Sequence, residues 1–168
     1  MSNVEIRSVT KRFGPLHALK DITLTFEENK MYGLLGRNGA GKSTLLNIMT
    51  NRLRSTEGNV YIDGQPVYEN DETLTKIYCM SEYTLFPDYM TVRNVKSLST
   101  GYSSILKIIT ARATHVPVLL LDEPVLGLDA NHRDLFYREL IANYSEQRES
   151  PSASVKRCRW AFSMLMSY

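Results

Sequence analysis

The sequence has few cysteines, no long apolar run and little excess charge. Its 168 residues include 2 cysteines, and 20 Lys+Arg stand against 18 Asp+Glu. Cys79 and Cys158 are too few and too far apart to indicate a disulfide framework or a metal site. The longest apolar run, 116–121, is far shorter than the ~20 residues of a membrane-spanning helix. The N-terminal residues lack the apolar core of a signal peptide, which predicts a cytoplasmic protein. The near-zero net charge gives no indication of a nucleic-acid partner.

The composition, with 43% apolar residues, is that of an ordinary globular domain. Apolar residues that alternate or run continuously predict strands, and those with helical spacing predict helices. The strands are expected at 4–9, 22–26, 30–35, 58–64, 76–80 and 116–121, and the helices at 42–54, 101–114 and 131–146. Strands that alternate with helices predict an α/β domain with a mainly parallel sheet.

A glycine-rich loop carries the strongest functional pattern. It fits G-x-x-x-x-G-K-[ST], between a predicted buried strand and a predicted helix, and consists of Gly36, Arg37, Asn38, Gly39, Ala40, Gly41, Lys42 and Ser43. Its glycines allow successive backbone N–H groups to point at an anion, and the helix dipole adds positive potential. Lys42 is expected at the β- and γ-phosphates and Ser43 at Mg²⁺. Thr44 either assists at the α-phosphate or is an ordinary helix-start residue. The pattern predicts a purine-nucleoside triphosphate site.

Two carboxylates follow the apolar run at 116–121. Asp122 is expected to hold Mg²⁺ through its water ligands, and Glu123 to polarise a water for in-line attack on the γ-phosphate. Alone, the pair would be equally typical of a strand that ends in a charged turn. Together with the phosphate loop it indicates a nucleotide-hydrolysing site.

Over residues 3–146 the chain resembles the ATP-binding subunit of an ABC transporter, apparently a bacterial one. Besides the two motifs above, Leu98-Ser-Thr-Gly-Tyr102 lies where the family has its L-S-G-G-Q signature, and Gly127-Leu-Asp129 follows Pro124 as the family's D-loop does. The resemblance implies an ATP-binding domain over 1–146. Its fold would be a P-loop NTPase core of the ABC ATPase type, mainly a parallel sheet with an antiparallel β edge and a helical subdomain.

The resemblance also implies how the site works. Two subunits would close head to tail, so that Ser99 and Gly101 of one meet the γ-phosphate bound by the other. Phe13 corresponds to an aromatic residue that stacks on adenine, although its side chain could instead belong to the core. Asp129 would link the two sites, but an N-cap role ahead of Asn131 is an equally good local interpretation.

The chain departs from the family in three places. Glu82 replaces the usual glutamine of the Q-loop, where it either holds a metal-bound water or is a surface residue without a role. Residues 83–97 leave room for one short helix instead of a multi-helix subdomain, which suggests an internal deletion. The tail, 147–168, is basic, lacks the family's histidine and is expected to be poorly ordered, as after a frameshift. A rival interpretation is a segment that touches anionic lipid.

The first functional hypothesis is therefore Mg-ATP binding and hydrolysis that energises a transporter. The partners would be a separately encoded membrane-spanning subunit and a second ATP-binding subunit, with no nucleic acid. The chain would lie peripherally on the inner face of the cell membrane. One alternative is a shortened subunit that binds nucleotide but hydrolyses it poorly. A soluble, non-transport ABC ATPase is a further alternative, which the length disfavours.

Overall fold

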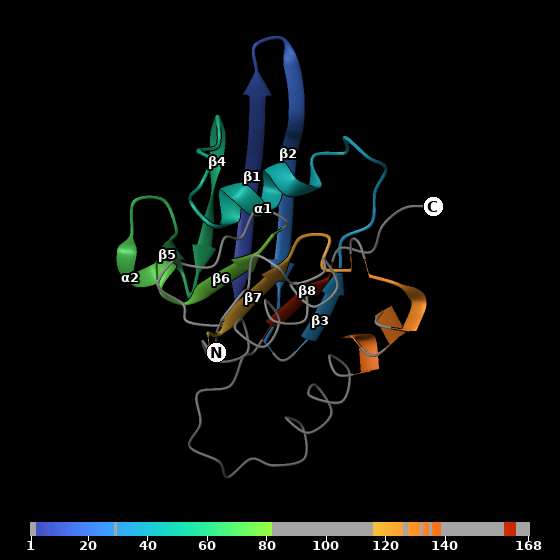
Figure 1. Ribbon diagram of the computed structural model, residues 1–168. Helices are drawn as coiled ribbons and strands as arrows, with labels where there is room; N and C mark the ends of the chain where they lie inside the picture. Colours follow the sequence, from blue (N-terminus) through green and yellow to red (C-terminus); the bar gives the residue numbers. More distant parts are fainter. Residues whose placement is uncertain are drawn as a thin grey trace, which may run out of the picture.

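A computed structural model describes residues 3–28, 30–81, 116–125, 128–131, 133–134 and 136–138, together with the backbone of 160–163. These residues form two four-stranded sheets with one helix between them (Figure 1). The elements are β1 (Val4–Phe13), β2 (Leu16–Phe26), β3 (Lys30–Gly33), α1 (Lys42–Met49), β4 (Glu57–Ile62), β5 (Gln65–Pro66), α2 (Asp71–Leu74), β6 (Ile77–Met80), β7 (Val118–Leu121) and β8 (Trp160–Ser163).

The first sheet is antiparallel, with the strand order β2-β1-β4-β5. Its register pairs Val4 with Phe26 on one side and with Ile62 on the other. All three side chains are buried, because strand residues on one face of a pleated sheet turn toward the same core. Strand β3, which belongs to the second sheet, contacts this first sheet through Tyr32. The Tyr32 ring packs edge-to-face on the Phe26 ring, with centroids 5.0 Å apart.

The second sheet is parallel, with the strand order β3-β8-β7-β6. Gly33 of β3, Ser163 of β8, Leu121 of β7 and Met80 of β6 are successive partners in its register. All four strands therefore end at the same edge of the sheet. The phosphate loop follows β3 and the two carboxylates follow β7, so the parallel arrangement brings both motifs to this edge.

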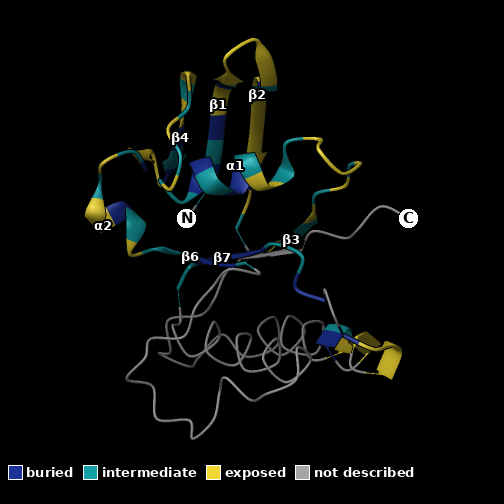
Figure 2. Cartoon of the chain, turned by 45° about the horizontal axis from the view of Figure 1, so that its top comes forward, coloured by how far each residue is buried: buried dark blue, intermediate teal, exposed yellow. Residues whose placement is uncertain are grey.

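The main core lies between the two sheets, around the buried face of α1. It contains residues of both sheets and of the helix, namely Val4, Ile6, Val9, Leu19, Phe26, Leu45, Leu46, Ile48, Met49, Val60, Ile62, Val67, Cys79, Val118 and Leu120. A second cluster covers the opposite face of the parallel sheet and includes Leu119, Leu121 and Phe136. Strand β7 is thus buried on both faces, as its continuous apolar run predicts. Figure 2 shows β7 in dark blue, the colour of buried residues.

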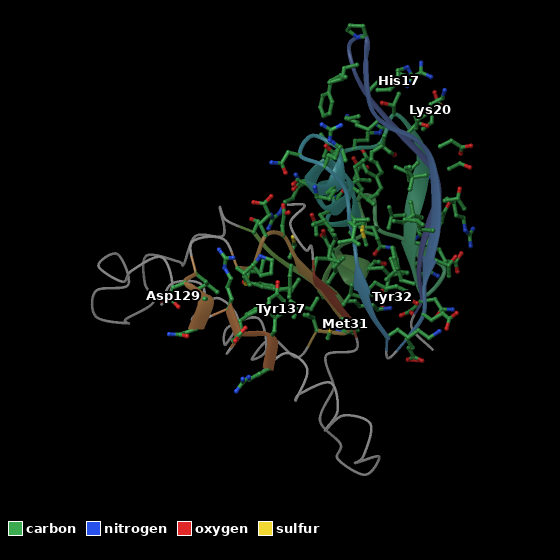
Figure 3. The ribbon with its side chains drawn as sticks, turned by 90° about the vertical axis from the view of Figure 1, so that its right-hand side faces the viewer. His17, Lys20, Met31, Tyr32, Asp129 and Tyr137 are labelled. Carbon is green, nitrogen blue, oxygen red and sulfur yellow. The ribbon has the colours of Figure 1, made fainter. Side chains whose placement is uncertain are left out.

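Figure 3 views these layers from the side. His17 and Lys20 lie on the antiparallel sheet, whereas Asp129 and Tyr137 lie on the far side of the parallel sheet. Residues 130–131, 133–134 and 136–138 are helical, and the Arg133 amide donates to the Asp129 carbonyl over 2.9 Å. Asp129 therefore occupies the N-terminus of this helix, the position that an N-cap requires.

The α/β class expected from the sequence is confirmed, with three differences of detail. The antiparallel strands form a sheet of their own instead of an edge on the parallel sheet. Strand β3 is not buried on both faces, because Met31 and Tyr32 are only half-buried and Leu35 after the strand is 71% exposed. The phosphate-loop helix ends at Met49, before the expected boundary at residue 54.

Within the tail, Trp160–Ser163 form β8, which lies between β3 and β7 in the parallel sheet. The physical reason is that a strand with neighbours on both sides gains two ladders of backbone hydrogen bonds, which depend little on the flanking sequence. The predicted helix at 101–114, the reduced subdomain at 83–97 and the remainder of the tail lie outside the described residues. No helix in the described part of the chain is long and apolar enough to cross a membrane.

Candidate nucleotide site

The predicted phosphate loop connects β3 to α1 at the carboxyl edge of the parallel sheet. Two glycines in the loop adopt positive φ angles, +80° at Gly39 and +84° at Gly41. The Ala40 amide donates to the Arg37 carbonyl over 3.0 Å, and the Leu45 amide donates to the Gly41 carbonyl over 2.9 Å. The chain therefore makes a tight turn and enters α1 directly, so that the loop wraps the start of the helix.

The first turn of α1 is open to an anion. Gly41 occupies the N-cap position, and no side chain caps the helix. The backbone N–H groups of a first helical turn have no partner within the helix, and they carry the positive end of its dipole. A phosphate group is the ligand that this combination favours.

Lys42 places its cation over the loop. Its ammonium donates to the Gly36 carbonyl over 2.6 Å and to the Arg37 carbonyl over 3.0 Å. These bonds hold the charge beside the backbone that would surround the phosphates. An arriving polyphosphate would compete with the two carbonyl oxygens for the ammonium, which a doubly or triply charged anion does well.

Ser43 and Asp122 come together from two different elements. The Ser43 hydroxyl, in the first turn of α1, lies 3.4 Å from the Asp122 Oδ1 atom at the end of β7. The Asp122 amide donates to the Met80 carbonyl over 2.8 Å, which ties this residue to the neighbouring strand. The sequence separates the two side chains widely, and only the parallel sheet brings them to one edge.

The donor set fits Mg²⁺. Both groups are hard oxygen donors, and neighbouring ligands in an octahedral Mg²⁺ shell with bonds of ~2.1 Å lie about 3 Å apart. Mg²⁺ in phosphate-binding sites uses one or two protein oxygens and completes its shell with water and phosphate. Among the described residues, no group of three or more His, Cys, Asp or Glu side chains could hold a metal ion. A site of this kind does not require such a group.

Glu123 follows Asp122 in a strained backbone conformation. Its φ angle is +49°, in the left-handed region, where a side chain with a Cβ costs roughly 1–2 kcal/mol. Its side chain is half-buried. The sequence analysis identified Glu123 as a candidate residue but did not predict its backbone strain. Five other non-glycine residues among the described ones share this left-handed conformation, so the strain does not by itself mark a functional residue.

Phe13 ends strand β1 and is 48% exposed. The alternative that its ring belongs to the core is therefore wrong. The Lys11 ammonium lies 5.0 Å from the ring centroid, which leaves the aromatic ring on the surface with one cation beside it. Thr44 is half-buried in the first turn of α1, which is compatible with both of its interpretations.

Sequence reasoning missed one support of the loop. A Cβ atom placed on Gly41 would lie 2.4 Å from the Ala18 carbonyl oxygen of β2, so the loop rests directly on the antiparallel sheet. No motif marks Ala18, and only the spatial arrangement identifies it. Three predicted site residues, Glu82, Ser99 and Gly101, lie outside the described part of the chain.

Comparison with known proteins agrees with this geometry. Residues 19–94 match the model of the family described as ABC transporter. The chain is 25% identical to the ABC transporter ATP-binding protein YtrB of Bacillus subtilis, covering 88% of this chain and 61% of the relative. It is 30% identical to the Fe(3+) ions import ATP-binding protein FbpC 1 of Pectobacterium atrosepticum, covering 87% of this chain and 51% of the relative. The chain thus spans roughly half to two thirds of the length of these relatives.

Among solved structures, the fold is similar to the dimeric structure of an ATP-binding cassette in a post-hydrolysis state, bound to ADP and phosphate. The TM-score is 0.73 at 23% identity, with 96% of this chain and 87% of that chain covered. The family match includes the whole phosphate loop and α1, and the similar fold extends over the parallel sheet that carries Asp122. Over most of its length, this chain is similar to ATP-binding proteins of ABC transporters.

Proposed function

We propose that this chain binds Mg-ATP and hydrolyses it as the energy-coupling subunit of an ABC transporter. The observation that carries the proposal is the 3.4 Å approach of the Ser43 hydroxyl to the Asp122 carboxylate. This approach unites the phosphate loop with the acidic end of β7 and forms an oxygen pair suited to Mg²⁺ beside an anion-binding helix N-terminus.

Each described residue would have a distinct role. The loop amides and the Lys42 ammonium would hold the β- and γ-phosphates, where they offset the charge that develops during phosphoryl transfer. Ser43 and Asp122 would hold Mg²⁺, which would offset the negative charge of the phosphates. Glu123 would orient the attacking water and accept its proton. Phe13 would stack on the adenine ring with its exposed face.

The partners follow from the family. The similar solved cassette is a dimer, and we infer that two copies of this chain, or this chain and a related one, close over ATP. In that arrangement Ser99 and Gly101 of one subunit would face the γ-phosphate held by the other, and Glu82 would contact a metal-bound water. A membrane-spanning subunit encoded separately would receive the energy, and this chain would then lie on the cytoplasmic face of the membrane.

A second candidate function rests on spacing in the sequence. The segment 83–97 is too short for the helical subdomain that normally presents the signature to the partner subunit. A chain with that deletion would bind Mg-ATP at the described site but hydrolyse it slowly. The two candidates agree on nucleotide binding and differ only in turnover.

One experiment separates the candidates. ATP affinity and steady-state hydrolysis would be measured on the purified chain and on Lys42→Ala and Glu123→Gln, with Lys20→Ala and Glu72→Gln as controls at exposed positions. Hydrolysis that Glu123→Gln abolishes, with binding retained, supports the ATPase. Binding without turnover supports the hydrolysis-impaired subunit. If Lys42→Ala binds ATP as tightly as the parent does, the proposed site is wrong.

A further inference from the structure

A lysine covers one side of the exposed aromatic ring at the end of β1. The Lys11 ammonium lies over the Phe13 ring, 5.0 Å from its centroid, which is within the range of a cation–π interaction. Phe13 is nevertheless 48% exposed. One face of the ring therefore has a charge beside it, and the part of the ring that Lys11 does not cover is open to a ligand.

A second contact holds the Lys11 ammonium in this place. It donates a hydrogen bond of 2.8 Å to the Arg54 carbonyl, in the segment that leads from α1 to β4. The neighbouring backbone is tied to the same segment, because the Thr56 amide donates to the Thr10 carbonyl over 2.8 Å and the Arg12 amide donates to the Thr56 hydroxyl over 3.0 Å. The ammonium is thus ordered before a ligand arrives, so the entropy of fixing this side chain is not lost on binding.

The ring also lies near the phosphate loop. A Cβ on Gly41 would stand 2.4 Å from the Ala18 carbonyl oxygen of β2. The next residue of β2, Leu19, is the register partner of Lys11, so the loop meets the antiparallel sheet beside Lys11. Phe13 is two residues further along β1, a distance of about 7 Å. A ligand whose phosphates occupy the loop would therefore have Phe13 within reach of its base.

We propose that Lys11 is a positioning residue for the nucleobase, which covers one face of Phe13 so that a purine stacks on the other. The inference rests on the proposed function, which assigns base stacking to Phe13. The faces of aromatic rings carry negative charge, and two rings stacked directly face to face repel each other for that reason. A cation over one face draws π density toward itself, so the opposite face becomes a better surface for an electron-rich purine. Lys11 thus favours a nucleotide over a polyphosphate without a base.

The test compares ATP with tripolyphosphate, which has the phosphates but no base. Both Kd values would be measured by calorimetry with Mg²⁺. Their ratio reports the contribution of the base, because loss of a nearby charge weakens both ligands alike. A cation–π contact at an exposed site corresponds to a factor of about two to five, and we expect Lys11→Met to lower the preference for ATP by that factor. Lys11→Arg keeps the cation and should keep the preference. Lys20→Met, at an exposed lysine of the same sheet, is the matched control and should leave the preference unchanged.

A double substitution shows whether Lys11 acts through the ring. Phe13→Ala should lower the preference for ATP about fivefold or more. Adding Lys11→Met to Phe13→Ala should lower it no further, because the two substitutions remove one shared contact. Lys11→Gln, which has no charge but can still donate to the Arg54 carbonyl, takes the place of Lys11→Met if the methionine variant does not fold, and it should show the same loss of preference.

The outcomes separate this inference from the proposed function. If the parent chain binds neither ATP nor tripolyphosphate, the proposed function fails and the inference with it. If the parent binds both ligands equally tightly, the phosphate site stands, but base stacking on Phe13 and the role of Lys11 are overturned. An unchanged preference in folded Lys11→Met, or a further loss when Lys11→Met is added to Phe13→Ala, overturns the inference alone.

Discussion

Gly41 of the phosphate loop lies directly against Ala18 of β2, so closely that a Cβ on Gly41 would stand 2.4 Å from the Ala18 carbonyl oxygen and 2.9 Å from a Leu19 methyl carbon. The φ angle of Gly41 is also positive, +84°. Two independent constraints thus require glycine at this position. The contact joins the antiparallel sheet to the nucleotide site, because any residue larger than glycine must push the loop away from β2.

Gly41→Ala should therefore destabilise the fold and weaken ATP binding together. The left-handed backbone alone costs roughly 1–2 kcal/mol for a residue with a Cβ, and the clash with backbone adds to this. Gly39→Ala is the matched control, since Gly39 also has a positive φ but nothing lies within 4 Å of its Cβ position. Urea unfolding should show a clearly larger loss for Gly41→Ala. Equal losses of unfolding free energy in the two variants would mean that backbone strain alone, without the Ala18 contact, requires glycine at position 41.

Ser43→Ala should remove the Mg²⁺ dependence of ATP binding and leave the Mg²⁺-free affinity nearly unchanged. The hydroxyl is one of the two described oxygens suited to the metal, whereas the proposed phosphate contacts would come from Lys42 and the loop amides. Ser43→Thr keeps the hydroxyl and should restore most of the effect. Calorimetric titration with and without Mg²⁺ would measure both. A threonine variant as defective as the alanine variant would argue against metal contact through this oxygen.

Replacement of Glu123 should separate stability from activity. Glu123→Gly relieves the positive φ of +49°, a strain of roughly 1–2 kcal/mol, against about 0.5–1 kcal/mol of added backbone entropy. Glu123→Gln keeps the strain. The glycine variant should thus unfold at an equal or higher urea concentration than the glutamine variant, although both lose hydrolysis.

The control for this comparison is Glu72, on the short helix α2 and without a positive φ. Glu72→Gly should be less stable than Glu72→Gln by about 0.5–1 kcal/mol, because glycine has no strain to relieve in a helix. If Glu123→Gly loses as much stability as Glu72→Gly does, the strain at Glu123 contributes nothing.

Sequence patterns located most of the described strands and the two motifs that the parallel sheet brings to one edge. The phosphate loop is a contiguous pattern that lies between a strand and a helix. Asp122 directly follows β7, whose apolar residues are buried on both faces of the sheet. Both motifs were found from the sequence, and the structure brings Ser43 and Asp122 together.

What could not be predicted depends on contacts between distant segments. The support of Gly41 by Ala18 leaves no trace in sequence, because the Ala18 contact is made by a backbone carbonyl, which every residue possesses. Strand β8 was missed for a similar reason. Its pairing with β3 and β7 uses backbone groups, and the charged and small residues around Trp160–Ser163 obscure any alternation that would indicate a strand.

Cys79 provides a prediction for alkaline pH. Burial in the core between the sheets raises the pKa of its thiol from 9.0 to about 11, with a smaller raising contribution from Asp122 and an opposing one from Arg52. The unfolded chain therefore loses the thiol proton before the folded chain does. Stability is unaffected below pH ~9 and falls as the pH rises toward 11, because the unfolded state then binds fewer protons.

The loss attributable to the thiol should approach about 2–3 kcal/mol near pH 11. It would be measured by urea unfolding between pH 8 and pH 11 in a Cys158→Ser background, with and without Cys79→Ala. The alanine variant should be less stable at pH 8, since it leaves a small cavity beside Leu120 in the core, but its stability should fall less steeply with pH. Parallel pH profiles for the two proteins would show that Cys79 ionises as freely in the folded chain as in the unfolded one.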